Sequence, residues 1–316
     1  MHILCCTDSN FVIPLGIMML SVCENNKDQE ITFHVIIDDS VTNSQKLEIA
    51  ENIKQLAIVK FYTIDITTIR EHLVVKIENF PISVYYRLLA ENVLPKDIDK
   101  ILYLDADIIV RHNLRELWET NITNHAIGAV VNQSDGLKFW ERLNYPVSKG
   151  YFNSGVIIIN LKYFRKHEIG KALLNFIINN QDALMMPDQD ALNFVLKDAK
   201  IHLPLRYNVQ EGFYRFPPTI TDSKELEEAV ADPYILHYTK EKPWDSKCNH
   251  PLKNIYYFYK QKSIWKDSSF MEHFRHKKIK QPLILRIKII VARVFTFIKV
   301  RRNNTNIIYK NIALKK

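Results

Sequence analysis

Short apolar runs alternate along this chain with longer segments in which apolar residues recur every three or four positions. The runs typical of buried strands are 2–7, 31–38, 58–64, 100–110, 126–131, 155–161 and 234–238. The segments with helical spacing are 11–25, 43–57, 163–179 and 190–197. Strands that alternate with helices predict a parallel sheet covered by helices on both faces.

Polar residues interrupt or follow two of the strand-like runs. Asp8, Ser9 and Asn10 come after the first run, and Asp105 and Asp107 stand late in the run 100–110. In sheets of this kind, ligands bind at the carboxyl ends of the strands. The seven glycines form neither a G-x-G-x-x-G motif nor a P-loop, so a bound nucleotide must be held in another way.

Asp105 and Asp107 flank Ala106 inside an apolar run that continues through Val110. Two carboxylates are costly to bury unless they are paired or bind a metal ion. If 100–110 is one regular strand, the two side chains share a face and form a site for a hard divalent cation, with room for phosphate oxygens. The alternative is a strand end that turns into solvent, with aspartates as turn formers. The apolar residues that follow favour the metal site.

Composition excludes several classes of protein. The chain has 316 residues, of which 47% are hydrophobic and 25% are charged, as in an ordinary globular protein with a full core. No secretory signal is evident at the N-terminus, and no run reaches the ~18 apolar residues of a spanning helix. The cysteines lack disulfide spacing and indicate reduced thiols in a cytosolic protein: Cys5, Cys6, Cys23 and Cys248.

The net charge of +8 is concentrated at the C-terminal end, where residues 260–316 hold sixteen Lys or Arg and two acids. We therefore expect a folded unit at 1–265 and a basic tail at 266–316. Helical spacing in 283–300 separates an apolar arc from four basic side chains, which predicts a helix lying on an anionic membrane surface. The alternative is a helix packed on its own domain. A nucleic-acid-binding protein would instead interleave basic and aromatic residues on a folded surface.

Six motifs occur in a fixed order: Asp8-Ser9-Asn10-Phe11, Tyr85-Tyr86-Arg87-Leu88, Leu102-Tyr103-Leu104-Asp105-Ala106-Asp107, Tyr151-Phe152-Asn153-Ser154-Gly155, Asp188-Gln189-Asp190 and His237 followed by Lys242-Pro243-Trp244. Over roughly residues 1–265 the chain resembles glycosyltransferase family 8, especially the bacterial enzymes that add glucose or galactose to lipopolysaccharide cores. The resemblance implies an α/β GT-A fold, Rossmann-like, with a mixed, mostly parallel sheet. It also implies a UDP-hexose donor, Mn²⁺ or Mg²⁺, and retention of anomeric configuration.

The resemblance further implies roles for individual residues. The metal ligands would be Asp105, Asp107 and His237. The uridine would be held by Asp8, Asn10 and Phe11. Arg87 and Lys242 would meet the sugar and diphosphate, and the donor site would be completed by Ala106, Asn132, Asn153 and Ser154. Asn153, Asp188 and Gln189 would line the sugar pocket. Asp188 and Gln189 would also be catalytic, with Gln189 stabilising an oxocarbenium-like state.

Each motif also has a structural interpretation. Asp8 could cap the next helix, and Arg87 could be a surface ion-pair partner. Residues 153–155 could form a turn before a strand, and 188–190 could begin a helix, because acids favour that end. His237 could be a core histidine.

The chain departs from the family pattern at two places. The loop between His237 and Lys242 is one residue shorter and lacks a glycine, so either Lys240 or Lys242 could reach the phosphates. Asn132 stands where relatives often carry an aspartate that contacts the sugar, which bears on donor choice.

The sequence therefore predicts a glycosyltransferase that acts on lipopolysaccharide or another surface glycan at the inner face of the cell membrane. Two alternatives remain open. One keeps the fold and the chemistry with a protein or soluble glycan acceptor. The other is a non-catalytic, membrane-bound protein that binds sugar nucleotides.

Overall fold

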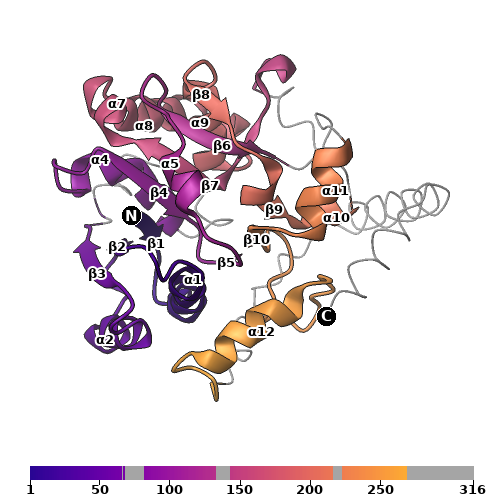
Figure 1. The fold of residues 1–316 in the computed structure, drawn as a ribbon. Coiled ribbons are helices and arrows are strands. Elements are labelled where there is room, and N and C mark those ends of the chain that lie inside the picture. Colours follow the sequence, from indigo (N-terminus) through magenta and orange to yellow (C-terminus); the bar gives the residue numbers. More distant parts are fainter. Residues whose placement is uncertain (66, 68–81, 133–142, 216–222, 269–316) are drawn as a thin grey trace, which may run out of the picture.

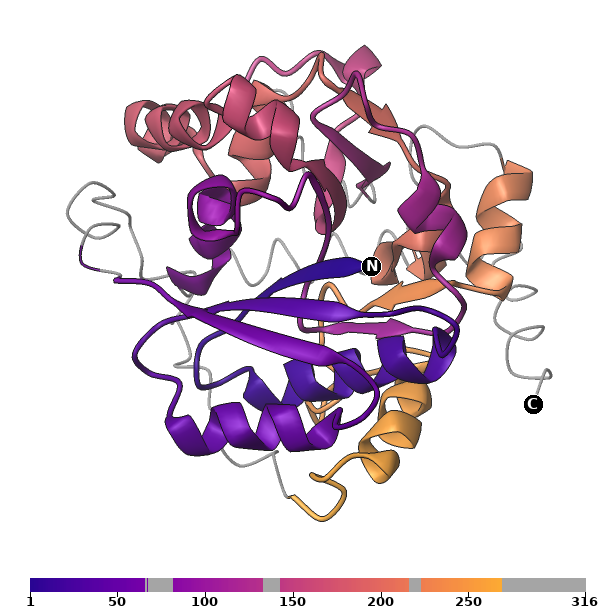
Figure 2. The ribbon, with the colours of Figure 1, turned by 60° about the vertical axis from the view of Figure 1, so that its left-hand side comes forward.

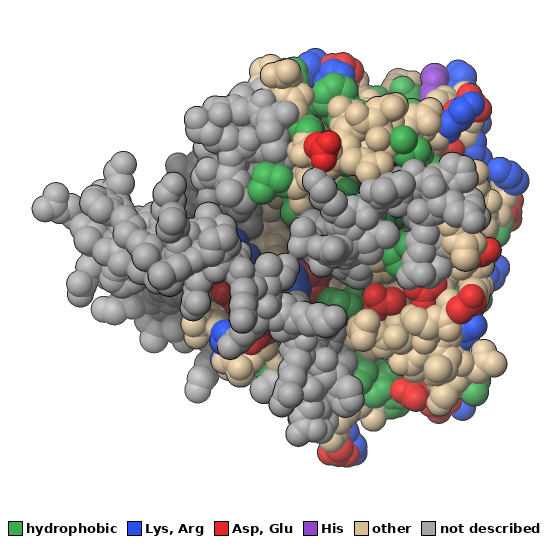
Figure 3. Space-filling model, turned by 180° about the vertical axis from the view of Figure 1, so that it is seen from behind, with side chains coloured by type: hydrophobic (Ala, Val, Ile, Leu, Met, Phe, Trp, Pro, Cys, Tyr) green, Lys and Arg blue, Asp and Glu red, His purple; other side chains and the backbone are tan. Residues whose placement is uncertain are grey.

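The computed structural model describes residues 1–65, 67, 82–132, 143–215 and 223–268. The segment 283–300, for which we predicted a membrane-surface helix, lies outside the described residues. Within the described ranges, no helix is both long enough and apolar enough to cross a bilayer. Acidic and basic side chains are interspersed over the described part of the face shown in Figure 3.

A seven-stranded sheet with the order β3-β2-β1-β4-β7-β6-β8 forms the centre of the molecule (Figure 1). Its strands are β1 (His2–Cys6), β2 (Thr32–Ile37), β3 (Ile58–Thr63), β4 (Lys100–Leu104), β6 (Ile127–Val131), β7 (Phe152–Asn160) and β8 (Lys200–His202). Only β7 runs antiparallel to its neighbours, β4 and β6, and the other pairs in this sheet are parallel. The predicted mixed, mostly parallel sheet is confirmed.

A second sheet of three strands has the order β5-β10-β9. Its members are β5 (Ile108–Val110), β9 (Val209–Gln210) and β10 (Ile235–His237). The expectation of one strand over 100–110 was wrong, because β4 ends at Leu104 and the chain turns before β5 pairs with β10. The apolar pattern continued through the turn because both halves are buried, each in a different sheet.

Helices cover both faces of the large sheet (Figures 1 and 2). In β1, Ile3 and Cys5 pack toward one face and Leu4 and Cys6 toward the other, the alternation expected of a fully buried strand. The first face is covered by α1 (Val12–Asn25), α2 (Asn43–Asn52) and α12 (Lys253–Lys262). The second is covered by the 3₁₀ helix η2 (Ile82–Leu89), α7 (Leu161–Lys166), α8 (Ile169–Asn180) and α9 (Pro187–Val195).

Shorter helices lie in the connections: α4 (Ala90–Val93), α5 (Arg115–Glu119), α10 (Glu211–Arg215) and α11 (Ser223–Ala231), with the 3₁₀ turns η3 (Val147–Lys149), η4 (Gln181–Ala183) and η5 (Leu205–Tyr207). The single helix expected over 163–179 is divided into α7 and α8. Glu168 adopts a left-handed conformation at the break, with φ of 49°, and this turns the chain between the two helices. All four cysteines lie in the described ranges and are buried, and none forms a disulfide, which agrees with the predicted reduced thiols.

The chain beyond α12 closes onto α1 and α2. Trp265 Nε1 donates a hydrogen bond to Glu48 Oε2 at 3.0 Å, and its ring fills the space above Gly16 so tightly that no Cβ fits there. Asn52 joins the same contact, since its amide donates to the Gly16 carbonyl and accepts from the Ile264 backbone. The residues up to Trp265 therefore pack in the same core as the N-terminal helices.

Three polar side chains form a hydrogen-bonded row across β1, β2 and β3. His34 Nε2 lies 3.0 Å from His2 Nδ1, and His34 Nδ1 lies 2.9 Å from the Tyr62 hydroxyl. Burial of His34, together with the charges of His2 and Lys60, lowers the pKa of its imidazole to about 4. The folded protein therefore holds His34 neutral at a pH where the unfolded chain is already protonated.

We expect the protein to lose stability as the pH falls from about 6.5 toward 4, because the unfolded state then binds a proton that folded His34 rejects. Between pH 7 and pH 5 this histidine should lower the free energy of unfolding by up to about 2 kcal/mol. Urea unfolding of the wild type and of His34→Gln at both pH values measures the effect. The exposed His167→Gln is the matched control. An unchanged pH dependence in His34→Gln would contradict the assignment.

Candidate active site

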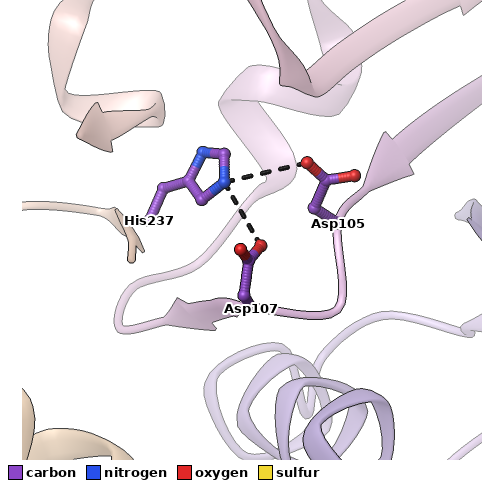
Figure 4. Close-up of side chains that lie close together, drawn as sticks. All are labelled: Asp105, Asp107 and His237. Carbon is purple, nitrogen blue, oxygen red and sulfur yellow. Dashed lines mark ion pairs between the residues drawn. The ribbon is translucent and has the colours of Figure 1, made fainter. Parts of the chain in front are cut away.

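Three potential metal ligands meet where the two sheets join. Asp105 follows β4, Asp107 precedes β5, and His237 is the last residue of β10. The His237 Nε2 atom lies 3.2 Å from Asp107 Oδ1 and 3.7 Å from Asp105 Oδ2, and both carboxylates face the ring (Figure 4). One ligand atom from each residue lies within 4.8 Å of the others, which is close enough for a single ion.

The turn that carries the two aspartates is anchored by backbone hydrogen bonds. The Asp105 amide donates to the Gly155 carbonyl at 2.9 Å, and the Asp107 carbonyl accepts from the Tyr238 amide at 3.1 Å. The side chains point inward, so the alternative of a strand end turning into solvent was wrong. Our reason for expecting convergence, a shared strand face, was also wrong. The carboxylates converge because the chain turns between two sheets.

The residues present fit a divalent cation. Carboxylate oxygens and an imidazole nitrogen suit ions such as Mn²⁺ and Mg²⁺, although Mg²⁺ prefers an all-oxygen shell. Asp107 Oδ1 is buried and accepts no hydrogen bond from any described residue, which is costly unless a ligand satisfies it. His237 is 3% exposed, so it is a buried histidine, as the structural interpretation held. Burial is compatible with binding a metal ion.

Arg87 holds Asp105 in place. Its guanidinium donates to Asp105 Oδ1 at 2.9 Å and to the Ser154 carbonyl at 2.7 Å, and it lies 4.2 Å above the Tyr103 ring. The Tyr103 hydroxyl donates to the same Oδ1 at 2.6 Å, which leaves Oδ2 to face His237. Arg87 is buried, so the surface ion-pair interpretation was wrong. Burial alone would lower the pKa of Arg87, but Asp105 and its other neighbours raise it above its ordinary value.

Lys242 contacts the candidate metal-ligand trio through Asp107. Its ammonium group forms an ion pair with Asp107 Oδ2 and donates to the Tyr238 carbonyl at 2.6 Å. Burial by itself would raise the pKa of Asp107, but the charges of Lys242 and His237 outweigh it and lower the pKa below its ordinary value. Asp107 is therefore held ionised, as a metal ligand must be.

The predicted sugar-pocket residues form one buried cluster. Gln189 Oε1 accepts hydrogen bonds from the Ser154 amide at 3.0 Å and from Asn153 Nδ2 at 3.2 Å. Half-buried Asn132 lies at the edge of this cluster, where its Oδ1 accepts a hydrogen bond from Asn153 Nδ2 at 3.5 Å. Asn153 and Ser154 lie within β7, so the interpretation of 153–155 as a turn before the strand was wrong.

Asp188 and Gln189 lie in the first turn of α9, which begins at Pro187, so the helix-start interpretation is correct and compatible with a functional role. Asp188 Oδ2 lies 3.5 Å from Arg87 Nε and accepts from the Ser154 hydroxyl at 3.3 Å. Burial raises the pKa of Asp188, against the opposing charge of Arg87.

The predicted uridine-binding residues occupy the loop between β1 and α1. β1 and β4 are parallel neighbours, so this loop leaves the same edge of the sheet as Asp105. Asp8 Oδ1 accepts from the Asn10 amide at 2.8 Å and does not cap α1, whose N-cap position is Phe11. Phe11 contacts the Trp244 ring edge-on, with 6.1 Å between centroids, which brings this loop against the segment that carries Lys242.

Sequence reasoning missed two residues that shape the site. Asn208 is fully buried and its Oδ1 lies 2.9 Å from His237 Nδ1, but no motif or spacing marks it. In the sequence, Gly155 stands out only as the last residue of the motif 151–155. Any Cβ at that position would lie 2.7 Å from Asp105 Oδ2 and closer still to the His237 ring, so glycine makes the approach of these ligands sterically feasible.

Known proteins share this architecture. A family profile described as "Glycosyl transferase family 8" matches residues 2–248. The chain is 30% identical to General stress protein A of Bacillus subtilis (strain 168) over 276 residues, which is 84% of this chain and 94% of the relative. It is 31% identical over 314 residues to a lipopolysaccharide 1,2-glucosyltransferase of Escherichia coli, covering 92% of this chain and 88% of the relative.

Among solved structures, the galactosyltransferase LgtC in complex with donor and acceptor sugar analogs matches with a TM-score of 0.75 and 26% identity. The match covers 84% of this chain and 96% of that chain. It confirms the predicted GT-A fold.

We expect Gly155→Ala to lower the affinity for Mn²⁺ at least about tenfold, because the added methyl group pushes His237 and Asp105 apart. Titration of the metal-free protein, followed by electron paramagnetic resonance, measures the affinity. Gly128→Ala is the control, since its methyl group would meet only Leu203 and Ile201 in the core. Wild-type Mn²⁺ affinity in folded Gly155→Ala would show that the ligands do not need this close approach.

Proposed function

Because this chain belongs to glycosyl transferase family 8, and is thus a glycosyltransferase, we propose that it transfers glucose or galactose from a UDP-sugar to a surface glycan such as lipopolysaccharide, with retention of configuration. The observation that carries this proposal is the convergence of Asp105, Asp107 and His237. The names of the relatives, a glucosyltransferase and a galactosyltransferase, support the two candidate sugars.

Charge governs the proposed chemistry. Departure of UDP develops negative charge on the diphosphate, and a divalent cation held by Asp105, Asp107 and His237 would supply electrostatic stabilisation there. Lys242 adds a positive charge at the same place, because its ammonium group already lies against Asp107. We therefore propose Lys242, rather than Lys240, as the phosphate-contacting lysine.

The remaining donor contacts follow from position. We propose that Asp8, Asn10 and Phe11 hold the uridine, with Ala106 in the turn between the two metal-binding aspartates. Arg87 and Asp188, together with the amides of Asn132, Asn153, Ser154 and Gln189, would line the sugar pocket.

The surroundings of Asp188 and Gln189 support a same-face attack through an oxocarbenium-like state. Asp188 is paired with Arg87, which makes its carboxylate a poor covalent nucleophile. Gln189 carries no charge, and its carbonyl oxygen is held by two N–H donors. Retention through a covalent glycosyl intermediate would need a free carboxylate at this point. We propose that Gln189 instead orients and stabilises the reacting sugar.

Two alternatives concern the acceptor and the activity. The name General stress protein A specifies no acceptor, so a protein or soluble glycan acceptor remains a second candidate. A protein that only bound sugar nucleotides would not need charge placed to stabilise a departing diphosphate, which is the role that we propose for the ligand trio and the neighbouring Lys242. The presence of both favours the enzyme.

We expect Asp105→Ala and Asp107→Ala each to reduce Mn²⁺-dependent release of UDP by about a hundredfold or more, as when a main electrostatic contact of a transition state is removed. A screen of UDP-sugars with wild-type protein identifies the donor first. Asp198→Ala, which breaks an exposed ion pair with Lys149, is the matched control. Full turnover of either variant at limiting metal would remove the basis of the proposal.

We further propose that the basic tail holds the enzyme on the inner, anionic face of the cell membrane. Removing residues 269–316 leaves the Trp265 contact with Glu48 intact. We expect this truncation to release the protein from anionic vesicles and to preserve activity on a small soluble acceptor. Each basic side chain near such a surface contributes about 1 kcal/mol, so binding of the full chain should weaken with salt. Equal co-sedimentation of both forms would rule out the anchor.

A further inference from the structure

The ring nitrogen of His237 that faces away from the carboxylates is buried against an amide. His237 Nδ1 lies 2.9 Å from Asn208 Oδ1, and Asn208 is fully buried. A neutral imidazole can bind a metal through Nε2 only if its proton resides on Nδ1. Distance alone does not reveal which nitrogen carries the proton, because an asparagine side chain can present either its oxygen or its nitrogen. The surrounding hydrogen bonds decide the question.

A backbone amide sets the direction of these hydrogen bonds. The Gly155 N–H can only donate, and it lies 3.0 Å from Asn153 Oδ1, so that atom must be the acceptor oxygen. The Asn208 side chain approaches the same oxygen at 2.9 Å and must therefore present its nitrogen there. Its oxygen then faces His237 and accepts the Nδ1 proton. Nε2 is then the ring nitrogen that faces Asp105 and Asp107 and can bind an ion there.

A second backbone amide fixes the other end of the same network. The Ser154 N–H donates to Gln189 Oε1 at 3.0 Å, and Asn153 Nδ2 donates to the same oxygen at 3.2 Å. Two consecutive residues of β7, Ser154 and Gly155, thus set the direction of one network that reaches from Gln189 through Asn153 and Asn208 to His237. Its four side chains are at most 8% exposed, so water competes little with these bonds.

We propose that Asn208 is a positioning residue that holds His237 in the tautomer able to bind the divalent cation and couples this metal ligand to the sugar pocket through Asn153. The inference rests on the proposed function for the identity of the site. Hydrogen-bond partners of metal-binding histidines fix the tautomer and the ring orientation, and their loss typically lowers metal affinity by about 10- to 100-fold. Asn208 therefore acts on the metal through His237 and on Gln189 through Asn153.

The tautomer is measured in the metal-free protein. Nitrogen NMR of ¹⁵N-histidine-labelled protein distinguishes the two tautomers, and His237→Gln identifies the signals of His237 among the eleven histidines. We expect the Nδ1–H form in the wild type. Asn208→Leu, which has nearly the same shape and no hydrogen-bonding groups, should populate the Nε2–H form. An Nδ1–H form that persists unchanged in folded Asn208→Leu would overturn the proposal.

Metal affinity provides the second measurement. We expect Asn208→Leu to bind Mn²⁺ about 10- to 100-fold more weakly and to lose the nitrogen coupling of His237 from the Mn²⁺ spin-echo spectrum. Asn208→Asp keeps an acceptor for the Nδ1 proton and should retain near wild-type Mn²⁺ affinity. An aspartate cannot donate to Asn153 Oδ1, so the same variant should lower kcat of the transfer reaction. If Asn208→Asp restores Mn²⁺ binding but not kcat, the hydrogen bond to His237 and the hydrogen bond to Asn153 have separate effects.

The control is another buried asparagine. Asn52→Leu removes two comparable hydrogen bonds, to Gly16 and Ile264, on the far side of α1. It should lower thermal stability and leave Mn²⁺ affinity unchanged. Equal losses of Mn²⁺ affinity in Asn52→Leu and Asn208→Leu would contradict the proposal, because Asn208 would then contribute only to general stability. A wild-type protein that binds Mn²⁺ and shows the Nδ1–H form, but turns over no UDP-sugar, would refute the proposed function and leave the positioning role supported.

Discussion

The turn from Asp105 to Asp107 holds two partly buried carboxylates at the junction of two sheets, and much of the surrounding structure serves to stabilise them. An unpaired buried carboxylate is costly, so each oxygen needs a donor or a metal ion. Arg87 and Tyr103 satisfy one oxygen of Asp105, and Lys242 satisfies one oxygen of Asp107. The remaining oxygens face His237. Charge compensation on the outer side therefore leaves the inner side of the trio available for a cation.

Backbone contacts with β7 also position the Asp105 carboxylate. β4 and β7 are antiparallel neighbours, and the Gly155 carbonyl holds the Asp105 amide just beyond the end of β4. The absence of a side chain at Gly155 admits His237 from the second sheet. The same stretch of β7 directs the amides of Asn153 and Gln189. One strand therefore organises both the candidate metal ligands and the residues that we propose for the sugar pocket, on a rigid element rather than on a loop.

Membership of the family establishes that the reaction is glycosyl transfer. The contacts of Asp188, Gln189 and Lys242 bear on how this chain would carry it out. Asp188 forms an ion pair with Arg87, and the Gln189 side-chain oxygen accepts hydrogen bonds from two N–H groups. Groups held in this way are preorganised, because they need little rearrangement as charge develops on the donor. In the shortened loop after His237, Lys242 forms an ion pair with Asp107, so a lysine lies beside the candidate metal ligands.

Local pattern in the sequence was enough to determine the alternating strands and helices, the absence of disulfide spacing among the cysteines, the paired aspartates and the order of the family motifs. These features depend on which residues are apolar and how they are spaced. Tertiary structure alone decided that 108–110 belongs to a second sheet, that α7 and α8 separate at Glu168, and that Asn208 orients His237. An apolar pattern reports that a segment is buried but not which segment covers it. A lone asparagine carries no spacing at all, and its role exists only once β9 and β10 lie side by side.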